Sequence, residues 1–207
     1  MSRKRGPILV LFGEVSSFWG RKMQIENMRV TTKNNKELLL RTIQKDDAET
    51  LLKFRRDVAG ETKFLTRYPY EIENSVDKEK EIIGNYLRAD HLAMVGIFED
   101  NRIIGLTSVT PVGMLFKTRH RATAELVVRK EYWNLGLGAY LLDIAVDCAG
   151  NCGYERLELN VFSDNARAIR LYKKKGFVNC GQIPQAFKMM DGSYHDEIIM
   201  SKNLWKH

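Results

Sequence analysis

The sequence predicts an α+β domain in which helices pack on both faces of one sheet, giving three α/β/α layers. Several short segments alternate apolar and polar residues, as strands do, whereas longer segments repeat apolar residues every three to four positions, as helices do. The two kinds of segment are interleaved along the chain, yet two strands near the middle are joined by a tight turn. Strands and helices mixed around a short antiparallel meander favour an α+β or three-layer α/β/α sandwich.

The first half of the domain is expected to form a strand at 37–43, a helix at 45–58 and a second helix at 75–88. Asp46 and Asp47 fall in the first turn of helix 45–58, where the helix dipole favours acidic side chains. The loop between the helices is dense in aromatic residues and is therefore either a packed lid or the wall of a binding site. The aromatic residues are Phe64, Tyr68 and Tyr70, and Pro69 lies between the two tyrosines.

The middle of the chain is expected to form a hairpin of strands 91–98 and 102–110, because the intervening Glu-Asp-Asn is a turn sequence. A strand at 122–128 then leads through a glycine turn into a helix that begins near Gly138. After strand 156–162, a helix at 165–175 is capped by Ser163 or Asp164 and ended by Gly176. The last strands are expected at 177–182 and 194–202.

Residues 1–36 are interpreted as a basic, mobile extension, and residues 37–207 as one domain without an internal repeat. The extension carries +6 of the total net charge of +7, so the domain itself is nearly neutral. Bulk charge therefore does not favour a nucleic-acid partner for the domain. The apolar run at 8–12 resembles a secretory signal but is too short. The natural start could instead be Met23 or Met28.

Cysteine usage and hydropathy favour a cytoplasmic protein that does not enter a membrane. The three cysteines are an odd number without a Cys-x-x-Cys pair, which fits a reducing compartment. The four histidines show no metal-ligand spacing, so no metal is expected. No apolar run approaches the ~20 residues that cross a bilayer.

The segment 124–142 combines a strand, a glycine turn and a helix start, and this arrangement predicts an anion site. Backbone N–H groups at a helix N-terminus lack intrahelical partners, and the helix dipole favours negative charge. The strand is apolar except for Glu125, and a carboxylate in such a strand is costly unless it has a task. Either a cross-strand Arg or Lys satisfies Glu125, or it performs chemistry.

Two motifs resemble the GCN5-related N-acetyltransferases (GNAT). Trp133-Asn134-Leu135-Gly136-Leu137-Gly138 is similar to their acetyl-CoA loop, Gln/Arg-x-x-Gly-x-Gly/Ala, with Trp133 in place of the usual Gln or Arg. The segment 165–177 is similar to their Asn-x-x-Ala-x-x-Leu-Tyr-x-x-x-Gly-Phe. The resemblance covers about 38–204 and implies an acyl-CoA N-acyltransferase fold with a mixed, mostly antiparallel sheet that is splayed at the central strand.

The resemblance implies binding of acetyl-CoA as acyl donor. The pantetheine arm would lie in the splayed gap along Leu126, Val127 and Val128, and the N–H of Val127 would polarise the thioester. The pyrophosphate would meet the N–H groups of Asn134, Leu135, Gly136, Leu137, Gly138 and Ala139. Asn165 would either bind pantetheine or cap its helix, and Lys174 would contact a phosphate or form part of a solvated helix end.

The same resemblance implies direct acetyl transfer to an amine, with Glu125 as base, through water, and Tyr172 as acid. Tyr172 could alternatively pack its helix onto the sheet. Phe64, Tyr68, Tyr194 and Asp196 are candidate acceptor-binding residues, with an exposed strand face as the alternative for the last two. The acceptor is a primary amine of a small molecule or of a peptide, and a homodimer is compatible with the family.

Three other functions fit the sequence less well. A non-catalytic acyl-CoA sensor would share the fold, but Glu125 and Tyr172 argue for catalysis. Nucleic-acid binding would rest on the extension alone. A Rossmann dinucleotide site lacks its third glycine and its acidic ribose ligand.

Overall fold

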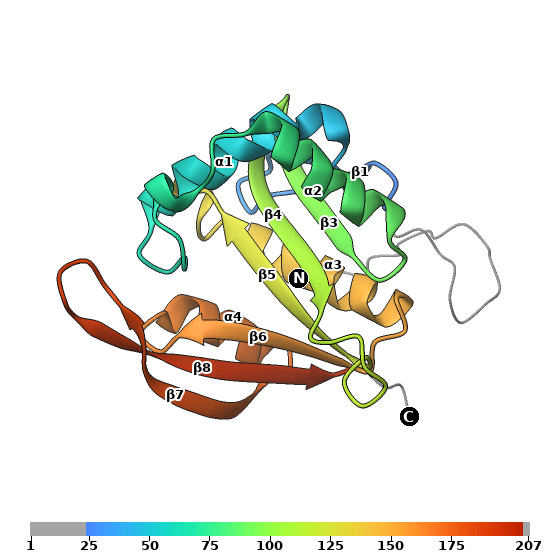
Figure 1. The fold of residues 1–207 in the computed structure, drawn as a ribbon. Helices are drawn as coiled ribbons and strands as arrows, with labels where there is room; N and C mark the ends of the chain where they lie inside the picture. The colour runs from blue at the N-terminus through green and yellow to red at the C-terminus, as the bar shows by residue number, and fades with distance from the viewer. Residues whose placement is uncertain (1–23, 205–207) are drawn as a thin grey trace, which may run out of the picture.

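The computed structural model describes residues 24–204, which form one mixed sheet flanked by helices (Figure 1). In this part of the chain the strand order is β1-β2-β3-β4-β5-β6-β8-β7, and only β5 and β6 run parallel. The strands are β1 (Met28–Thr31), β2 (Glu37–Thr42), β3 (Ala93–Glu99), β4 (Arg102–Pro111), β5 (Arg121–Val128), β6 (Arg156–Phe162), β7 (Val178–Lys188) and β8 (Tyr194–Asn203). The helices are α1 (Ala48–Glu61), α2 (Val76–Arg88), α3 (Leu137–Asn151) and α4 (Ala166–Lys174), with short 3-10 turns η1 (Lys45–Asp47), η2 (Pro69–Glu71) and η3 (Lys130–Tyr132).

Two hydrophobic cores, one on each face of the sheet, confirm the predicted three-layer α/β/α architecture. On one face, Leu51 and Phe54 of α1 and Ile83 of α2 pack against β3 and β4. On the other face, Leu141 and Leu142 of α3 are fully buried against the sheet, and α4 packs at the edge of the same core. Figure 1 shows α1 and α2 in front of the sheet and α3 behind it. The apolar stripes seen in the sequence therefore face the sheet.

The sheet is splayed between β5 and β6, as expected. The two strands pair only where Arg121, Ala122 and Thr123 lie opposite Arg156, Leu157 and Glu158. Beyond that point they diverge, and β6 continues to pair with β8 (Figure 1). Arg121 secures the paired end, because its Nε and Nη2 donate to the Glu158 carboxylate at 2.6 and 2.8 Å. The second half of β5, from Ala124 to Val128, is therefore not paired with β6.

The N-terminal boundary differs from the expected one. Strand β1 pairs with β2, and the Ile25 N–H donates to Thr42 Oγ1 at 2.7 Å, so the sheet already includes residues before Glu37. The expected extension therefore overlaps a β-hairpin, while its basic part at 1–23 lies outside the described residues. The alternation in β1 covers only four residues, with Val30 buried and Arg29 exposed, which is a weak sequence pattern.

Strand β7 is longer than the expected 177–182 segment. It continues past Pro184 through a register shift, with Gln185 at a positive φ of 52°. Proline interrupts a ladder in the middle of a sheet but is tolerated on an edge strand, and β7 is the edge strand.

Within residues 24–204, no helix is long and apolar enough to cross a membrane.

Candidate active site

The register of β5 decides which of its backbone groups are free. The Arg129 N–H donates to the Ile104 carbonyl at 2.9 Å, and Val127 lies opposite Leu106. Backbone groups of successive residues point alternately to the two sides of a strand. Glu125 and Val127 therefore bond to β4 as Arg129 does, whereas the N–H and carbonyl groups of Leu126 and Val128 face the gap.

This alternation corrects one expectation. The N–H of Val127 faces β4 and is not placed to polarise a thioester in the gap. The N–H groups that face the gap belong to Leu126 and Val128. The Val127 side chain instead lines a cavity on the opposite face of the sheet.

The glycine turn leads into α3 as the motif predicts. Asn134 and Gly136 both have positive φ, 64° and 92°, and the second value favours glycine. The carbonyl of Gly136 accepts the first helical bonds, and the N–H groups of Leu137 and Gly138 are among those that a helix cannot satisfy internally. The β1–β2 turn supports this loop, because the Lys33 N–H donates to the Leu135 carbonyl at 3.0 Å.

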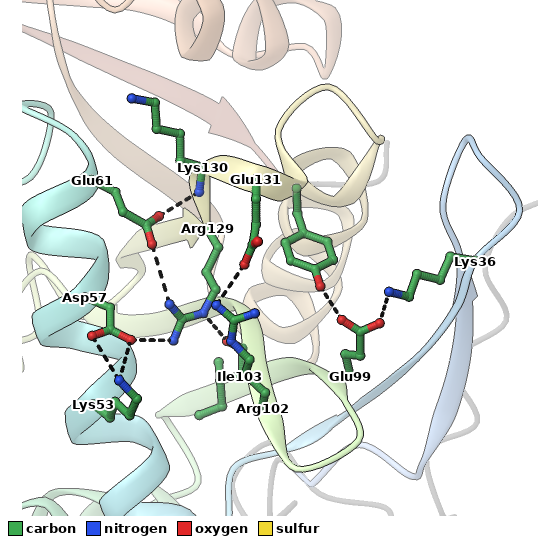
Figure 2. Close-up of polar contacts among 11 residues, drawn as sticks. Lys36, Lys53, Asp57, Glu61, Glu99, Arg102, Ile103, Arg129, Lys130 and Glu131 are labelled. Carbon is green, nitrogen blue, oxygen red and sulfur yellow. Dashed lines mark hydrogen bonds and ion pairs between the residues drawn. The ribbon is translucent and has the colours of Figure 1, made fainter.

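Buried Arg129 anchors the segment just before the glycine turn (Figure 2). Its side chain is only 3% exposed, and its Nε donates to the Ile103 carbonyl at 2.8 Å. Its two other guanidinium nitrogens pair with Asp57 at 3.1 Å and with Glu61 at 3.5 Å, both on α1. Glu61 also accepts from the Lys130 N–H at 2.7 Å. The end of β5 is thereby tied to β4 and to the last turns of α1.

Further contacts hold η3 from the neighbouring hairpins. Glu99 accepts from the Tyr132 hydroxyl and pairs with Lys36, and Arg102 pairs with Glu131 at 2.8 Å (Figure 2). These contacts come from the β1–β2 turn and from the β3–β4 hairpin. The segment that leads into the glycine turn is therefore held by α1, by the β1–β2 turn and by the β3–β4 hairpin.

Glu125 faces a cavity of about 710 Å³ on the α1/α2 side of the sheet. The cavity is bounded by α1, α2, the loop between them, β4 and β5. The Glu125 side chain is exposed, and the residue opposite it on β4 is Ser108. Among residues 24–204 no cation forms an ion pair with Glu125, so the alternative of a cross-strand Arg or Lys is not found.

Three further polar residues of the cavity were missed by the sequence analysis. Arg55 on α1 and Glu79 on α2 form an ion pair at 3.4 Å, and Tyr86 on α2 lines the same cavity as Ser108 of β4. Glu79 is buried, its Oε2 has no hydrogen-bond partner among the described residues, and burial raises its pKa. Glu79 and Tyr86 are seven residues apart on the inward face of α2, and polar residues at this spacing on an apolar stripe were the available signal.

Tyr172 is buried on α4. It is 6% exposed, its ring packs against Phe177 at 6.2 Å, and burial raises its pKa to about 12. These contacts show that Tyr172 packs its helix, which was one of the two expected roles. A buried, protonated hydroxyl also keeps the ability to donate a proton, so the acid role stays a prediction.

Asn165 and Lys174 lie at opposite ends of α4. The Asn165 side chain caps the helix by accepting from the Ala168 N–H at 3.2 Å. Lys174 is exposed in the last turn, roughly 13 Å further along the helix axis. Its neighbour Lys175 pairs with Asp143 of α3 at 2.5 Å. The basic end of α4 therefore braces α3, and the structure does not bring Lys174 to Asn165.

None of the four candidate acceptor residues lines the cavity. Phe64 packs edge-on against Phe162 at 5.9 Å, and the Tyr68 hydroxyl accepts from the Met190 N–H at 3.0 Å. The aromatic loop thus packs on β6 and on the β7–β8 hairpin, as a lid would. Leu65, Thr66 and Arg67 of the same loop line the cavity instead.

Tyr194 and Asp196 lie on the β7–β8 hairpin. Tyr194 is about half exposed, with Lys188 over its ring at 5.6 Å. Asp196 accepts from Gln182 Nε2 at 2.6 Å and from the Gln185 N–H at 2.8 Å. Asp196 therefore stabilises the bulge in β7, and neither residue shares the cavity with Glu125.

The chain combines a splayed strand, a glycine turn at a helix start and a cavity beside a carboxylate. The model of the acetyltransferase (GNAT) family matches residues 57–177. The chain belongs to the GNAT acetyltransferase family. Its members use acetyl-CoA, so this protein is an acyltransferase.

Relatives and solved structures agree with this membership. This GNAT protein is 23% identical over 177 residues to the spermidine N(1)-acetyltransferase of Vibrio cholerae, covering 82% of this chain and 97% of that one. A GNAT acetyltransferase from Streptococcus pneumoniae is 30% identical, with a TM-score of 0.77 over 81% of this chain and 99% of its own. A putative acetyltransferase from Salmonella typhimurium, solved with its cofactor acetyl-CoA, shares the fold at 20% identity and a TM-score of 0.73, over 83% and 96% of the two chains.

The residues of this acetyltransferase suit acetyl-CoA. A pantetheine arm carries amide groups, and the gap offers the N–H and carbonyl of Leu126 and the N–H of Val128 to pair with them, whereas the Val128 carbonyl already accepts from Trp133 Nε1 at 2.7 Å. A diphosphate needs donors and positive potential, and the first turn of α3 offers both. No cluster of three or more His, Cys, Asp or Glu side chains that could hold a metal ion occurs among residues 24–204.

Proposed function

We propose that this GNAT enzyme transfers the acetyl group of acetyl-CoA to a primary amine that enters the cavity, with Glu125 as the base. One observation carries the proposal. Glu125 opens into the cavity on one face of β5, and the next residue, Leu126, presents its backbone to the gap. Acceptor and donor would therefore approach the same point of one strand from two different directions.

Acetyl-CoA supplies the acetyl thioester in this reaction. The acceptor nitrogen must be neutral to attack, so Glu125 removes its proton, directly or through one water molecule. The C–N bond forms as the C–S bond breaks, and Tyr172 gives its proton to the departing sulfur. The nitrogen loses its second proton as the amide forms, and that proton restores Tyr172 through solvent. A gap-facing N–H of Leu126 or Val128 donates to the carbonyl oxygen as negative charge develops there.

The relatives favour a small amine as acceptor. One relative acts on spermidine, and another, 36% identical over 92 residues that cover 42% of this chain and 27% of its own, is the mycothiol acetyltransferase of Jonesia denitrificans. The cavity carries charges of both signs, with Arg55 and Arg67 beside Glu79 on the helical side and Glu125 on the strand side. This lining suits a small, polar, amine-bearing molecule, with a peptide amine as the second class.

The test of this proposal is the substitution Glu125→Gln, which keeps the shape of the side chain and removes the base. We expect the turnover number to fall by at least about 100-fold, while the dissociation constant for acetyl-CoA stays unchanged. Glu81→Gln is the matched control, because Glu81 is an exposed residue of α2 outside the cavity. Turnover by Glu125→Gln equal to that of the control would remove Glu125 from the base role.

A further inference from the structure

An arginine and a tryptophan stack across the mouth of the splayed gap. The guanidinium carbon of Arg167 lies 3.4 Å from the centre of the Trp133 ring. Trp133 stands in the loop before α3, and Arg167 is in the first turn of α4. The indole is also held by a hydrogen bond, because its Nε1 donates to the Val128 carbonyl at 2.7 Å. The stack therefore joins the end of β5 to α4, which follows β6.

The same face of α4 lies against the start of α3. Leu171 follows Arg167 by four residues, so the two side chains share one face of the helix. A side chain added to Gly138 would meet Leu171 Cδ2 at 3.3 Å. Leu171 therefore sits on the first turn of α3, and Arg167, one turn nearer the N-terminus of α4, sits beside the loop that leads into it.

Arg167 carries a charge that the described part of the protein does not neutralise. No carboxylate between residues 24 and 204 forms an ion pair with it, and its contact is the ring of Trp133. Burial lowers the pKa of its guanidinium, which means that water is partly withdrawn from a cation. Arginines in such positions ordinarily have an acidic partner.

The stacked geometry leaves the guanidinium able to bind an anion. Stacking uses the flat face of the group, and the five N–H donors point outward in its plane. That plane borders the loop whose N–H groups and helix dipole favour an anion. The usual Gln or Arg of the acetyl-CoA loop is Trp133 here, so the loop itself lacks a charged or amide side chain at that position.

We propose that Arg167, held in place by Trp133, binds a phosphate oxygen of the acetyl-CoA diphosphate together with the N–H groups of the loop and of the first turn of α3. Trp133 therefore does not contact the diphosphate itself, as the usual Gln or Arg would. Instead, it positions the Arg167 guanidinium, which comes from α4. This inference rests on the proposed use of acetyl-CoA but not on the acceptor or on Glu125.

The test compares two acetyl donors by titration calorimetry on the full chain. Acetyl-CoA carries the diphosphate, whereas acetyl-pantetheine lacks it. For Arg167→Ala we expect the dissociation constant of acetyl-CoA to rise roughly tenfold or more, and that of acetyl-pantetheine to stay unchanged. Arg170→Ala is the matched control, because Arg170 is an exposed arginine of the same helix, and it should bind both donors as the wild type does.

A second variant guards against loss of folding. Arg167→Lys keeps the charge but loses the planar stack and the paired donors, so its affinity for acetyl-CoA should lie between those of the wild type and of Arg167→Ala. Equal acetyl-CoA affinity for wild type and Arg167→Ala would overturn the inference, and so would an equal loss for both donors. Tighter binding by Arg167→Ala would show that the stack closes the gap rather than binding the donor. Failure of the wild type to bind acetyl-CoA would instead remove the proposed function as a whole.

Discussion

Tyr172 and Glu125 occupy opposite environments although both are proposed to move protons. Glu125 is exposed to a cavity that an acceptor can enter, whereas Tyr172 is 6% exposed beneath α4. The base must meet an incoming amine, and the acid must stay protonated until the sulfur leaves. Burial serves the second need, because it raises the pKa of Tyr172 to about 12.

The shifted pKa makes a prediction at the residue scale. An unperturbed tyrosine loses its proton near pH 10, and an enzyme that relied on it would lose turnover there. Here Tyr172 stays protonated, so the wild-type turnover number should show no fall between pH 9 and about 10.5. Tyr172→Phe should lower it roughly 100-fold at every pH in that range. A fall near pH 10 in the wild type that Tyr172→Phe lacks would contradict the shift.

The sequence was sufficient to identify a residue that interrupts an apolar pattern. It was not sufficient where the role of a residue depends on how strands pair or helices pack. Glu125 stood out as a lone carboxylate in an apolar strand, and it does face the cavity. The choice between Val127 and its neighbours depended on how β5 pairs with β4, which no local pattern encodes. Arg55 and Glu79 come from two helices, and only the packing of these helices brings them together at 3.4 Å.

At the scale of elements, the end of β5 is held by Arg129 rather than by the glycine turn itself. The guanidinium ties β5 to β4 and α1 through one carbonyl and two carboxylates. Arg129→Ala would leave Asp57 and Glu61 without this partner. Because those carboxylates are about one-third exposed, we expect a loss of about 2 kcal/mol in the free energy of unfolding rather than the larger loss of a fully buried pair.

Urea denaturation of Arg129→Ala measures this loss. Arg102→Ala serves as control, because the Arg102–Glu131 pair is exposed and should contribute less than about 1 kcal/mol. The acetyl-CoA dissociation constant should also rise in Arg129→Ala, since the loop it anchors becomes less ordered. Equal stability of the two variants would show that the anchor is not needed.

The junction of β2 and α1 makes a second prediction at this scale. Arg41 donates to Asp47 at 2.6 and 2.8 Å. Burial opposes ionisation of Asp47, but the bonds from Arg41 and from the Gln44 N–H outweigh it and lower its pKa. A lowered folded-state pKa stabilises the fold above the unfolded value near 3.9, and this stabilisation disappears as the pH falls through the folded value.

Asp47→Asn should therefore cost about 1–3 kcal/mol of unfolding free energy at pH 7 and progressively less below pH 4. Asp46→Asn is the control, because Asp46 is exposed in the same turn. The two variants are compared by urea denaturation at pH 7 and pH 3. A deficit in Asp47→Asn that is the same at both pH values would contradict the assignment.

The elements themselves were largely predictable, and the exceptions have physical reasons. Long apolar stripes and turn residues located α1 to α4 and the strands from β2 to β6. Strand β1 is four residues long and is recognised only through its pairing with β2. Strand β7 contains Pro184, which argues against a strand except at an edge, and the sequence does not tell which strand is the edge.

At the scale of the whole molecule, strand β5 borders two different spaces, the gap toward β6 and the cavity beneath α1 and α2. β5 and β6 diverge along one edge of β5 (Figure 1). The cavity lies on the face of the sheet covered by α1 and α2. Buried Arg129 and the hairpin contacts to η3 fix the loop that follows β5. In the proposed function, this arrangement brings donor and acceptor to the same strand.

The most direct test of this account is a thiol-release assay with acetyl-CoA and a panel of amines: spermidine, amino acids, aminoglycosides and short peptides. The account predicts that at least one small amine makes CoA release depend on the enzyme, and that mass spectrometry finds the acetyl group on the amine nitrogen. Tight binding of acetyl-CoA without turnover of any amine would contradict it and would favour an acyl-CoA sensor.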